Sequence, residues 1–332
     1  MVSTQKKTRK PRSGVSGNPA KRGVMRAHTA HLEQRRATPR DWIAGARLRT
    51  LPLSIAPVVA GSGAAMLVSR EFHWVIALAC LAVAVFLQIG VNYANDYSDG
   101  IRGTDRFRVG PGRLVGSGKA TAKSVLTVAL VFFALAAIAG LAITIRTQQW
   151  WFLAIGAVAI IAAWFYTGGK RPYGYNALGE VFVFIFFGLV ATLGTTWAQV
   201  QYLPQEAWFS AIAIGFLACA VLLANNLRDI DQDREAGKRT LTVLIGKLPT
   251  QILFTLFLLL PFGLSVWFAV FYPVAWLSLM ALLSALPALL IMWTYRTPRE
   301  LVTCLALTSL TALIWAIFIA WAFFGGPIAV VG

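Results

Sequence analysis

Cysteine, histidine and charged residues are scarce in this sequence, and each shortage excludes a class of protein. The 332 residues include three Cys and three His, with no paired spacing of the kind that binds zinc. Neither a disulfide framework nor a zinc site is therefore expected. Charged residues make up 13% of the chain and hydrophobic residues 58%. A soluble domain carries roughly 25% charged residues, so this composition indicates a polytopic protein of the lipid bilayer.

Nine apolar stretches come close to the roughly 20 residues that a membrane helix needs. We therefore predict an all-α polytopic membrane protein, a nine-transmembrane-helix bundle with a central cavity open to the cytoplasmic face. The predicted spans are 51–68, 74–94, 125–145, 150–166, 180–202, 208–227, 251–271, 274–294 and 302–324.

The first 40 residues have a different composition. They hold eleven Lys or Arg and one acid, Glu33, among many Ser, Gly and Pro. We predict a disordered basic cytoplasmic tail over 1–40 and one membrane domain over 41–332. The tail has no apolar core of a secretory signal peptide. No aromatic residues interleave its charges, so nucleic-acid binding is not expected.

Lys and Arg are distributed unevenly between the predicted loops. The outer loops carry only Arg70 and Arg146, whereas the loops on the opposite side carry fifteen cations. Because positive loops stay in the cytoplasm, this asymmetry predicts a multi-pass protein of the cell (inner) membrane with a cytoplasmic N-terminus. Nine spans would place the C-terminus outside.

Two polar stripes occur where spans two and six reach the cytoplasmic side. Residues spaced by three or four share one face of a helix. An acid inside a membrane helix is costly, so a stripe of acids and amides favours a functional site over a solvated helix end. The first stripe is Asn92, Asn95, Asp96 and Asp99, and the second is Asn225, Asp229 and Asp233, flanked by Asn226.

Cations and glycines surround these stripes. Glycine permits close approach of the backbone, and cations with such loops suit a polyanion such as diphosphate. A loop that merely obeys the positive-inside rule would contain many of the same cations. The candidate diphosphate-binding residues are Arg49, Arg113, Lys119, Tyr166, Lys170, Arg171 and Lys238.

Carboxylates on two converging helices need a counter-charge. Ligand sets made only of oxygen select Mg²⁺, with Mn²⁺ possible, and Mg²⁺ shares its coordination with substrate phosphates. A metal-bound diphosphate above an apolar bundle fits a polyprenyl diphosphate, whose allylic carbon an electron-rich acceptor would attack. The candidate metal ligands are Asn95, Asp96, Asp99, Asp105, Asn225, Asn226, Asp229 and Asp233.

The segments NDYSDGIRGTD, YTGGKRPYG and NNLRDIDQD resemble the motifs of the UbiA superfamily of membrane prenyltransferases over roughly residues 40–325. The resemblance implies a nine-helix fold and two aspartate-rich motifs that bind Mg²⁺ and prenyl diphosphate. Asp105 departs from the usual motif spacing. By position the motifs carry over to Asn95, Asp99, Asp105, Asn225 or Asn226, Asp229 and Asp233, with Tyr166, Lys170 and Arg171 on the phosphate. We expect Asp99, Asp229, Asp233 and Lys170 to be catalytic.

Within the superfamily, LRTLPLSIAPV and DREAGKRTL are most similar to the branch that prenylates 1,4-dihydroxy-2-naphthoate. That likeness implies loss of the ring carboxylate and formation of demethylmenaquinone in menaquinone biosynthesis. Arg49 or Lys119 would then bind the carboxylate of the acceptor. Alternatives are the acceptors 4-hydroxybenzoate, haem or a chlorin. A cation transporter is a more distant alternative, because it would place its acids near the middle of the bilayer.

Overall fold

Helices supply the regular structure of the residues that the computed structural model describes, 36–103 and 113–326. The predicted all-α membrane fold is therefore confirmed, with no strand in the described part of the chain. From Ala37 onward the chain forms one compact unit. The predicted tail over 1–40 lies almost wholly outside the described residues and stays a prediction.

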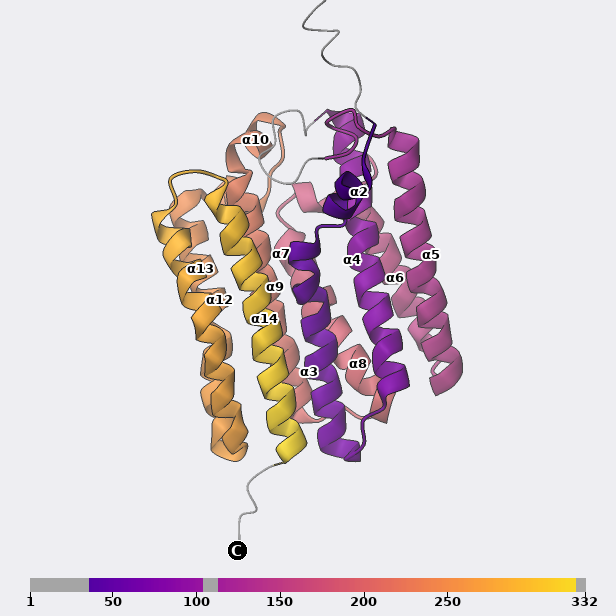
Figure 1. Ribbon diagram of the computed structural model, residues 1–332, viewed down its shortest axis with the longest axis vertical. Coiled ribbons are helices and arrows are strands. Elements are labelled where there is room, and N and C mark those ends of the chain that lie inside the picture. Colours follow the sequence, from indigo (N-terminus) through magenta and orange to yellow (C-terminus); the bar gives the residue numbers. More distant parts are fainter. Residues whose placement is uncertain (1–35, 104–112, 327–332) are drawn as a thin grey trace, which may run out of the picture. The chain divides into compact units, whose positions relative to one another are not determined.

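Long helices build the bundle, and short helical segments connect them at its ends (Figure 1). The long elements are α3 (Leu51–Ser69), α4 (Trp74–Arg102), α5 (Ala122–Thr147), α6 (Trp151–Phe165), α8 (Ala191–Val200), α9 (Gln205–Arg228), α12 (Lys247–Phe271), α13 (Leu282–Thr294) and α14 (Glu300–Gly325). The short ones are α2 (Pro39–Gly45), η1 (Leu48–Thr50), η2 (Tyr173–Tyr175), α7 (Gly179–Val183), the π-helix η3 (Phe184–Val190), α10 (Ile230–Glu235), α11 (Leu241–Ile245) and η4 (Pro273–Ala281).

The predicted spans coincide with helical segments, but the count of nine is not confirmed. Eight segments of the described chain are long and apolar enough to cross a membrane. The predicted span 150–166 forms α6, an apolar helix of 15 residues. At 1.5 Å per residue such a helix is about 22 Å long, shorter than a hydrocarbon core of about 30 Å.

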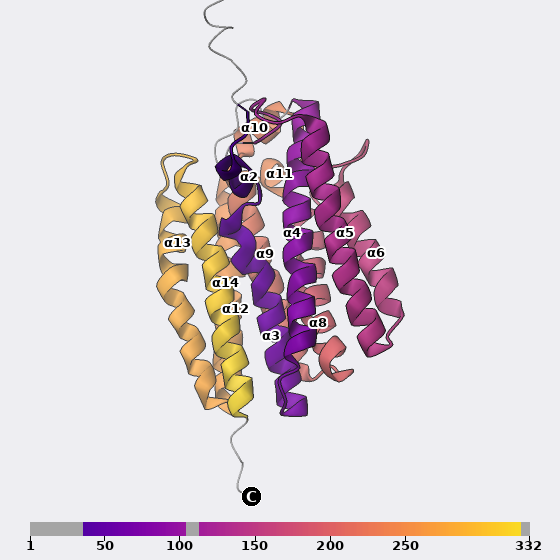
Figure 2. The same cartoon turned by 45° about the vertical axis from the view of Figure 1, so that its right-hand side comes forward.

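Helix α4 is longer than a membrane crossing requires. Its 29 residues span about 43 Å and end at Gly103, which adopts a left-handed conformation with φ 73°. Since the apolar core is about 30 Å thick, the polar last turns of α4 extend past the apolar part of the bundle. The short helices α2 and α10 lie at this same end (Figures 1 and 2).

Small residues allow the C-terminal helices to pack closely against α3. Helices α12, α13 and α14 form one side of the bundle, and α4, α5 and α6 form the other (Figures 1 and 2). The largest buried apolar cluster joins α3, α9, α12 and α14. A Cβ added at Gly63 of α3 would lie 2.5 Å from the Cα of Ala320 in α14, so the two backbones nearly touch there.

This contact predicts a stability effect that does not involve the polar residues. Gly63→Ala should lower the free energy of unfolding by about 1–3 kcal/mol, because the new methyl group meets backbone that cannot move aside. Thermal unfolding in detergent measures the change. Gly263→Ala in α12 is the matched control, since a Cβ there meets nothing within 4 Å. Equal unfolding temperatures for the two variants would contradict the close packing of α3 and α14.

Candidate active site

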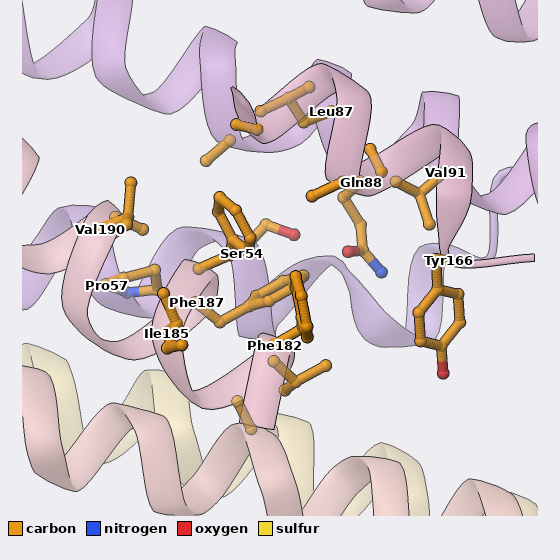
Figure 3. A pocket seen from close by; sticks show the side chains of 18 of the residues that line it. Ser54, Pro57, Leu87, Gln88, Val91, Tyr166, Phe182, Ile185, Phe187 and Val190 are labelled. Atoms are coloured by element: carbon orange, nitrogen blue, oxygen red, sulfur yellow. The ribbon is translucent and has the colours of Figure 1, made fainter. Parts of the chain in front are cut away.

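A cavity of about 660 Å³ lies inside the bundle. Its walls come from α3, α4, α6, α9 and the continuous segment α7–η3–α8. One end is polar and is lined by the last turns of α4 and the segment after α9, including Asp99 and Asp233. The rest is apolar and aromatic, with Pro57, Phe187 and Val190 among its lining residues (Figure 3). A cavity with this division suits a ligand that has a charged head and a hydrocarbon body.

Asp99 is the centre of the polar end. It is 2% exposed and receives a hydrogen bond from the hydroxyl group of Tyr175. The Arg113 guanidinium lies 3.2 Å from Asp99 Oδ2, and the Lys238 ammonium lies 3.5 Å from Asp99 Oδ1. Lys238 also lies 3.3 Å from Oδ1 of Asp233. The two aspartate-bearing segments therefore meet, and one ammonium group bridges their carboxylates.

Burial makes this charge pairing obligatory. A buried charge without a partner is strongly unfavourable, so the two carboxylates of Asp99 and Asp233 are balanced by the two cations Arg113 and Lys238. The ring of Tyr175 also faces Lys238, with the ammonium 4.6 Å from its centroid. Burial first, and then the neighbouring Asp99 carboxylate, raise the pKa of the Tyr175 phenol. Its hydroxyl therefore remains a hydrogen-bond donor at neutral pH.

The second stripe does not continue as one straight helix. Helix α9 ends at Arg228, Asp229 has φ −101° and ψ 8°, and α10 starts at Ile230. Arg228 turns back onto Asp229 with a contact of 2.6 Å and donates a 2.9 Å bond to Asn225 Oδ1. Asp229 is 1% exposed and is not among the residues that line the cavity. The three residues would share one face only if the helix continued, and it is interrupted at Asp229.

The remaining residues of the two stripes bind neighbouring segments. Both carboxylate oxygens of Asp96 accept backbone N–H groups, from Leu114 at 2.8 Å and Val115 at 3.1 Å, so Asp96 holds the returning loop against α4. Asn95 Oδ1 accepts a 2.7 Å bond from the Thr167 hydroxyl.

Two of the amides bond elsewhere. Asn226 donates to the carboxylate of Glu180 at 3.1 Å, and Asn92 donates to the Ala46 carbonyl at 3.0 Å. Asp105 lies outside the described residues. The structure thus brings Asp99 and Asp233 together through Lys238 and gives most of their neighbours other hydrogen-bond partners.

The predicted diphosphate-binding residues differ in where they lie. Arg113, Tyr166 and Lys238 line the cavity, whereas Arg49, Lys170 and Arg171 are exposed and are not among its lining residues. Lys119 pairs instead with Asp41 of α2 at 2.6 Å, where Thr38 and Asp41 cap that helix.

The sequence interpretation did not identify several residues that line the cavity: Arg47, Thr50, Ser54, Gln88 and Thr167. Arg47 has a positive φ of 54°, a backbone conformation that the sequence pattern around it does not predict. Ser54 and Gln88 carried a usable signal, because each is a polar residue inside an apolar span.

The donor set of the polar end fits a hard divalent cation. Asp99, Asp233, Asn95 and Asn225 all line the cavity, and the oxygen donors that their side chains carry suit Mg²⁺ or Mn²⁺. Within the described ranges, no three Asp, Glu, His or Cys side chains group closely enough to hold a metal ion. A site with two protein carboxylates suits an ion that arrives with phosphate oxygens and shares them.

Comparisons with known proteins agree with this geometry. The model of the UbiA prenyltransferase family matches residues 54–302. The chain is 48% identical over 289 residues to a 1,4-dihydroxy-2-naphthoate octaprenyltransferase of Mycobacterium tuberculosis, covering 87% of this chain and 98% of that one. It is 34% identical over 284 residues to the protein of the same name from Haemophilus influenzae, covering 82% and 92%.

Among solved structures, a UbiA homolog from Archaeoglobus fulgidus bound to GPP and Mg²⁺ has a TM-score of 0.59. The identity is 18%, and the match covers 85% of this chain and 98% of that chain. At this identity the likeness concerns the fold.

Proposed function

Because the chain belongs to the UbiA prenyltransferase family, we propose that it transfers a polyprenyl group to 1,4-dihydroxy-2-naphthoate. It is a multi-pass membrane protein and a prenyltransferase. In the proposed reaction the bond between the prenyl C1 and the diphosphate oxygen breaks, and C1 bonds to a ring carbon of the acceptor. The ring carboxylate leaves as CO₂, and the product is the reduced form of demethylmenaquinone, a menaquinone precursor.

The observation that carries this proposal is the junction at Lys238. Two buried aspartates from segments far apart in sequence converge on one ammonium group, at the end of an otherwise apolar cavity. A diphosphate is negative and its metal ion is positive. The ion would therefore pair with the two aspartates, and the phosphate oxygens would pair with Lys238. The apolar remainder of the cavity receives the first part of a hydrocarbon chain.

The residues around the junction have separate proposed roles. Asp99 and Asp233, with the amide oxygens of Asn95 and Asn225, would hold Mg²⁺, and the bound ion would neutralise charge on the departing diphosphate. Lys238 and Arg113 would bind the remaining phosphate oxygens. Tyr175, already a donor to Asp99, would keep that carboxylate in place.

Other predicted residues fall outside these roles. Asp96 has a structural role, because it holds the returning loop against α4. Asp229 pairs with Arg228 and thereby orients Arg228 and Asn225. Lys170, Arg171, Arg49 and Lys119 are left out of the diphosphate site, because none of them lines the cavity. We further propose that the polar end faces the cytoplasm of the cell in which the protein resides, as the positive loops predict.

Acceptor identity is tested by a competition between aromatic substrates. Purified protein in detergent with labelled polyprenyl diphosphate should form labelled product from 1,4-dihydroxy-2-naphthoate and release labelled CO₂ from its carboxylate. Product from 4-hydroxybenzoate, haem or a chlorin, with none from the naphthoate, would overturn the proposed acceptor. Formation of product without any ion gradient also separates an enzyme from a cation transporter.

Metal removal is expected to stop the reaction. An excess of EDTA should lower turnover by at least about 10³-fold, because the buried carboxylates then cannot be bridged to the diphosphate. Added Mg²⁺ or Mn²⁺ should restore turnover, and the same concentration of Na⁺ is the control. Turnover that persists in EDTA after dialysis would contradict a divalent cation in the site.

A further inference from the structure

A buried hydroxyl group without a partner lies in the wall of the cavity. Ser54 of α3 is 1% exposed, and its Oγ makes no hydrogen bond within the described part of the chain. Figure 3 shows this oxygen directed into the cavity, toward the space that the Gln88 side chain also enters from α4. Buried polar groups almost always have partners, so an exception that faces a cavity indicates a missing ligand.

Gln88 presents a second polar atom to the same space. Its Nε2 donates a 3.2 Å bond to Thr50 Oγ1, and the Thr50 hydroxyl donates its own proton to the Arg47 carbonyl at 2.9 Å. A hydroxyl with its only proton engaged can act toward Gln88 only as an acceptor. The amide nitrogen is thereby fixed on Thr50, and the amide oxygen is left to accept a hydrogen bond from the cavity.

The opposite wall is aromatic. Phe182 and Phe187 line the cavity below Ser54 in Figure 3, and Tyr166 lies at the right-hand end of that view, beyond Gln88. A slot with aromatic rings on one side and hydrogen-bonding groups on the other fits a flat ring that carries hydroxyl groups. A hydrocarbon chain in the same place would leave the Ser54 hydroxyl and the Gln88 oxygen without partners, which is unfavourable.

The slot lies at a suitable depth below the charged end. Gln88 precedes Asp99 by three helical turns of α4, which corresponds to about 16 Å along the helix axis. That interval holds a diphosphate next to Asp99, the prenyl C1 beneath it, and a two-ring aromatic acceptor between C1 and Gln88. The polar groups therefore lie beside the far ring substituents of such an acceptor.

We infer that Ser54 and Gln88 bind the hydroxyl groups of a fused-ring aromatic acceptor and thereby select it. Gln88 Oε1 accepts the proton of one ring hydroxyl, and Ser54 Oγ hydrogen-bonds to a ring oxygen. The inference rests on the proposed function, because it names the residues that bind and select the acceptor in that same cavity. It adds a specificity role for two residues far from the aspartates and cations.

The test combines two variants with an acceptor that lacks one hydroxyl group. Ser54→Ala and Gln88→Leu should each weaken binding of 1,4-dihydroxy-2-naphthoate about 10-fold, with the KM for polyprenyl diphosphate changed less than about twofold. The wild-type protein should prefer this diol to 1-hydroxy-2-naphthoate, which lacks the 4-hydroxyl group. In the variant that has lost the hydrogen-bond partner of the 4-hydroxyl group, the ratio of the two affinities should fall by the same factor.

Stability separates this role from a structural one. Because the Ser54 hydroxyl has no partner, Ser54→Ala should unfold at the same temperature as the wild type or higher. Ser62→Ala, eight residues further along α3, is the matched control: Ser62 is 6% exposed, accepts a 2.9 Å bond from Gln199 and does not line the cavity. That control should lose stability and keep its acceptor affinity.

The outcomes distinguish this inference from the proposed function. Unchanged acceptor affinity and unchanged preference in both variants would overturn the inference, even where the wild-type protein prenylates dihydroxynaphthoate as proposed. If the wild type instead binds another phenolic acceptor, the proposed acceptor fails. Calorimetric titration then measures how tightly the same two variants bind that phenol and its deoxy analogue. If each variant loses the same affinity for both ligands, relative to the wild type, the inference is overturned.

Discussion

Asp99→Asn is expected to lower turnover by at least about 10³-fold while the protein still inserts and folds. The amide keeps the size of the carboxylate and an oxygen for the Tyr175 hydroxyl, but it removes the charge that faces Lys238 and Arg113. The site then loses a charged metal ligand, and the two cations that this charge balanced repel Mg²⁺. Steady-state kinetics at saturating prenyl diphosphate, over a range of Mg²⁺ concentrations, measures the effect.

The second aspartate motif offers a control residue. Asp231 carries the same charge two residues before Asp233, but its side chain is 84% exposed and pairs with Arg234 on the surface. Asp231→Asn should stay within about twofold of the wild type. Asp99→Asn with near-normal turnover and a normal Mg²⁺ requirement would exclude Asp99 as a metal ligand.

Lys238→Met should produce two changes of opposite direction. Turnover should fall about 10²-fold, because the departing diphosphate loses a cation. Binding of Mg²⁺ alone should become tighter, because in the wild type the ion must displace an ammonium group that pairs with both Asp99 and Asp233. The unfolding temperature of the variant should therefore rise more steeply with Mg²⁺ concentration than that of the wild type.

The neighbouring residue supplies the comparison for that experiment. Arg239 is exposed, and its backbone N–H donates to the Tyr175 carbonyl at 2.9 Å, a bond that a change of side chain preserves. Arg239→Met should leave both the turnover and the Mg²⁺-dependent stabilisation close to those of the wild type. Identical Mg²⁺ responses in Lys238→Met and the wild type would show that the ammonium does not compete with the ion.

The helices were predictable because the bilayer imposes a length on apolar segments. Their boundaries were less so, and α4 illustrates the reason. The apolar run ends near residue 94 and the polar stripe predicts helix as far as Asp99, but the helix ends only at Arg102, because Asp96 anchors the returning loop and Asp99 has partners from three other segments. Such tertiary contacts have no signature in a local pattern.

The chemistry of the site was predictable from the sequence, but the residues that form it were predictable only in part. Spacing placed Asp99 on a polar stripe, and Lys238 followed from its position beside glycine. Loop cations such as Lys170 and Arg171 give a topology signal that does not report where a side chain points. The turn of Arg228 onto Asp229 depends on a break in the helix, which a period of 3.6 residues cannot reveal.

The contact of Gly63 with Ala320 also bears on the length of the prenyl chain that the cavity can hold. It closes the bundle between α3 and α14, so the cavity cannot widen toward the C-terminal helices. On the other side, Ile155 of α6 and Ile185 of η3 line the cavity and are 36% and 37% exposed. For the proposed substrate, we expect the isoprene units beyond the first few to leave the cavity between these two residues, so turnover should depend little on the length of the prenyl chain.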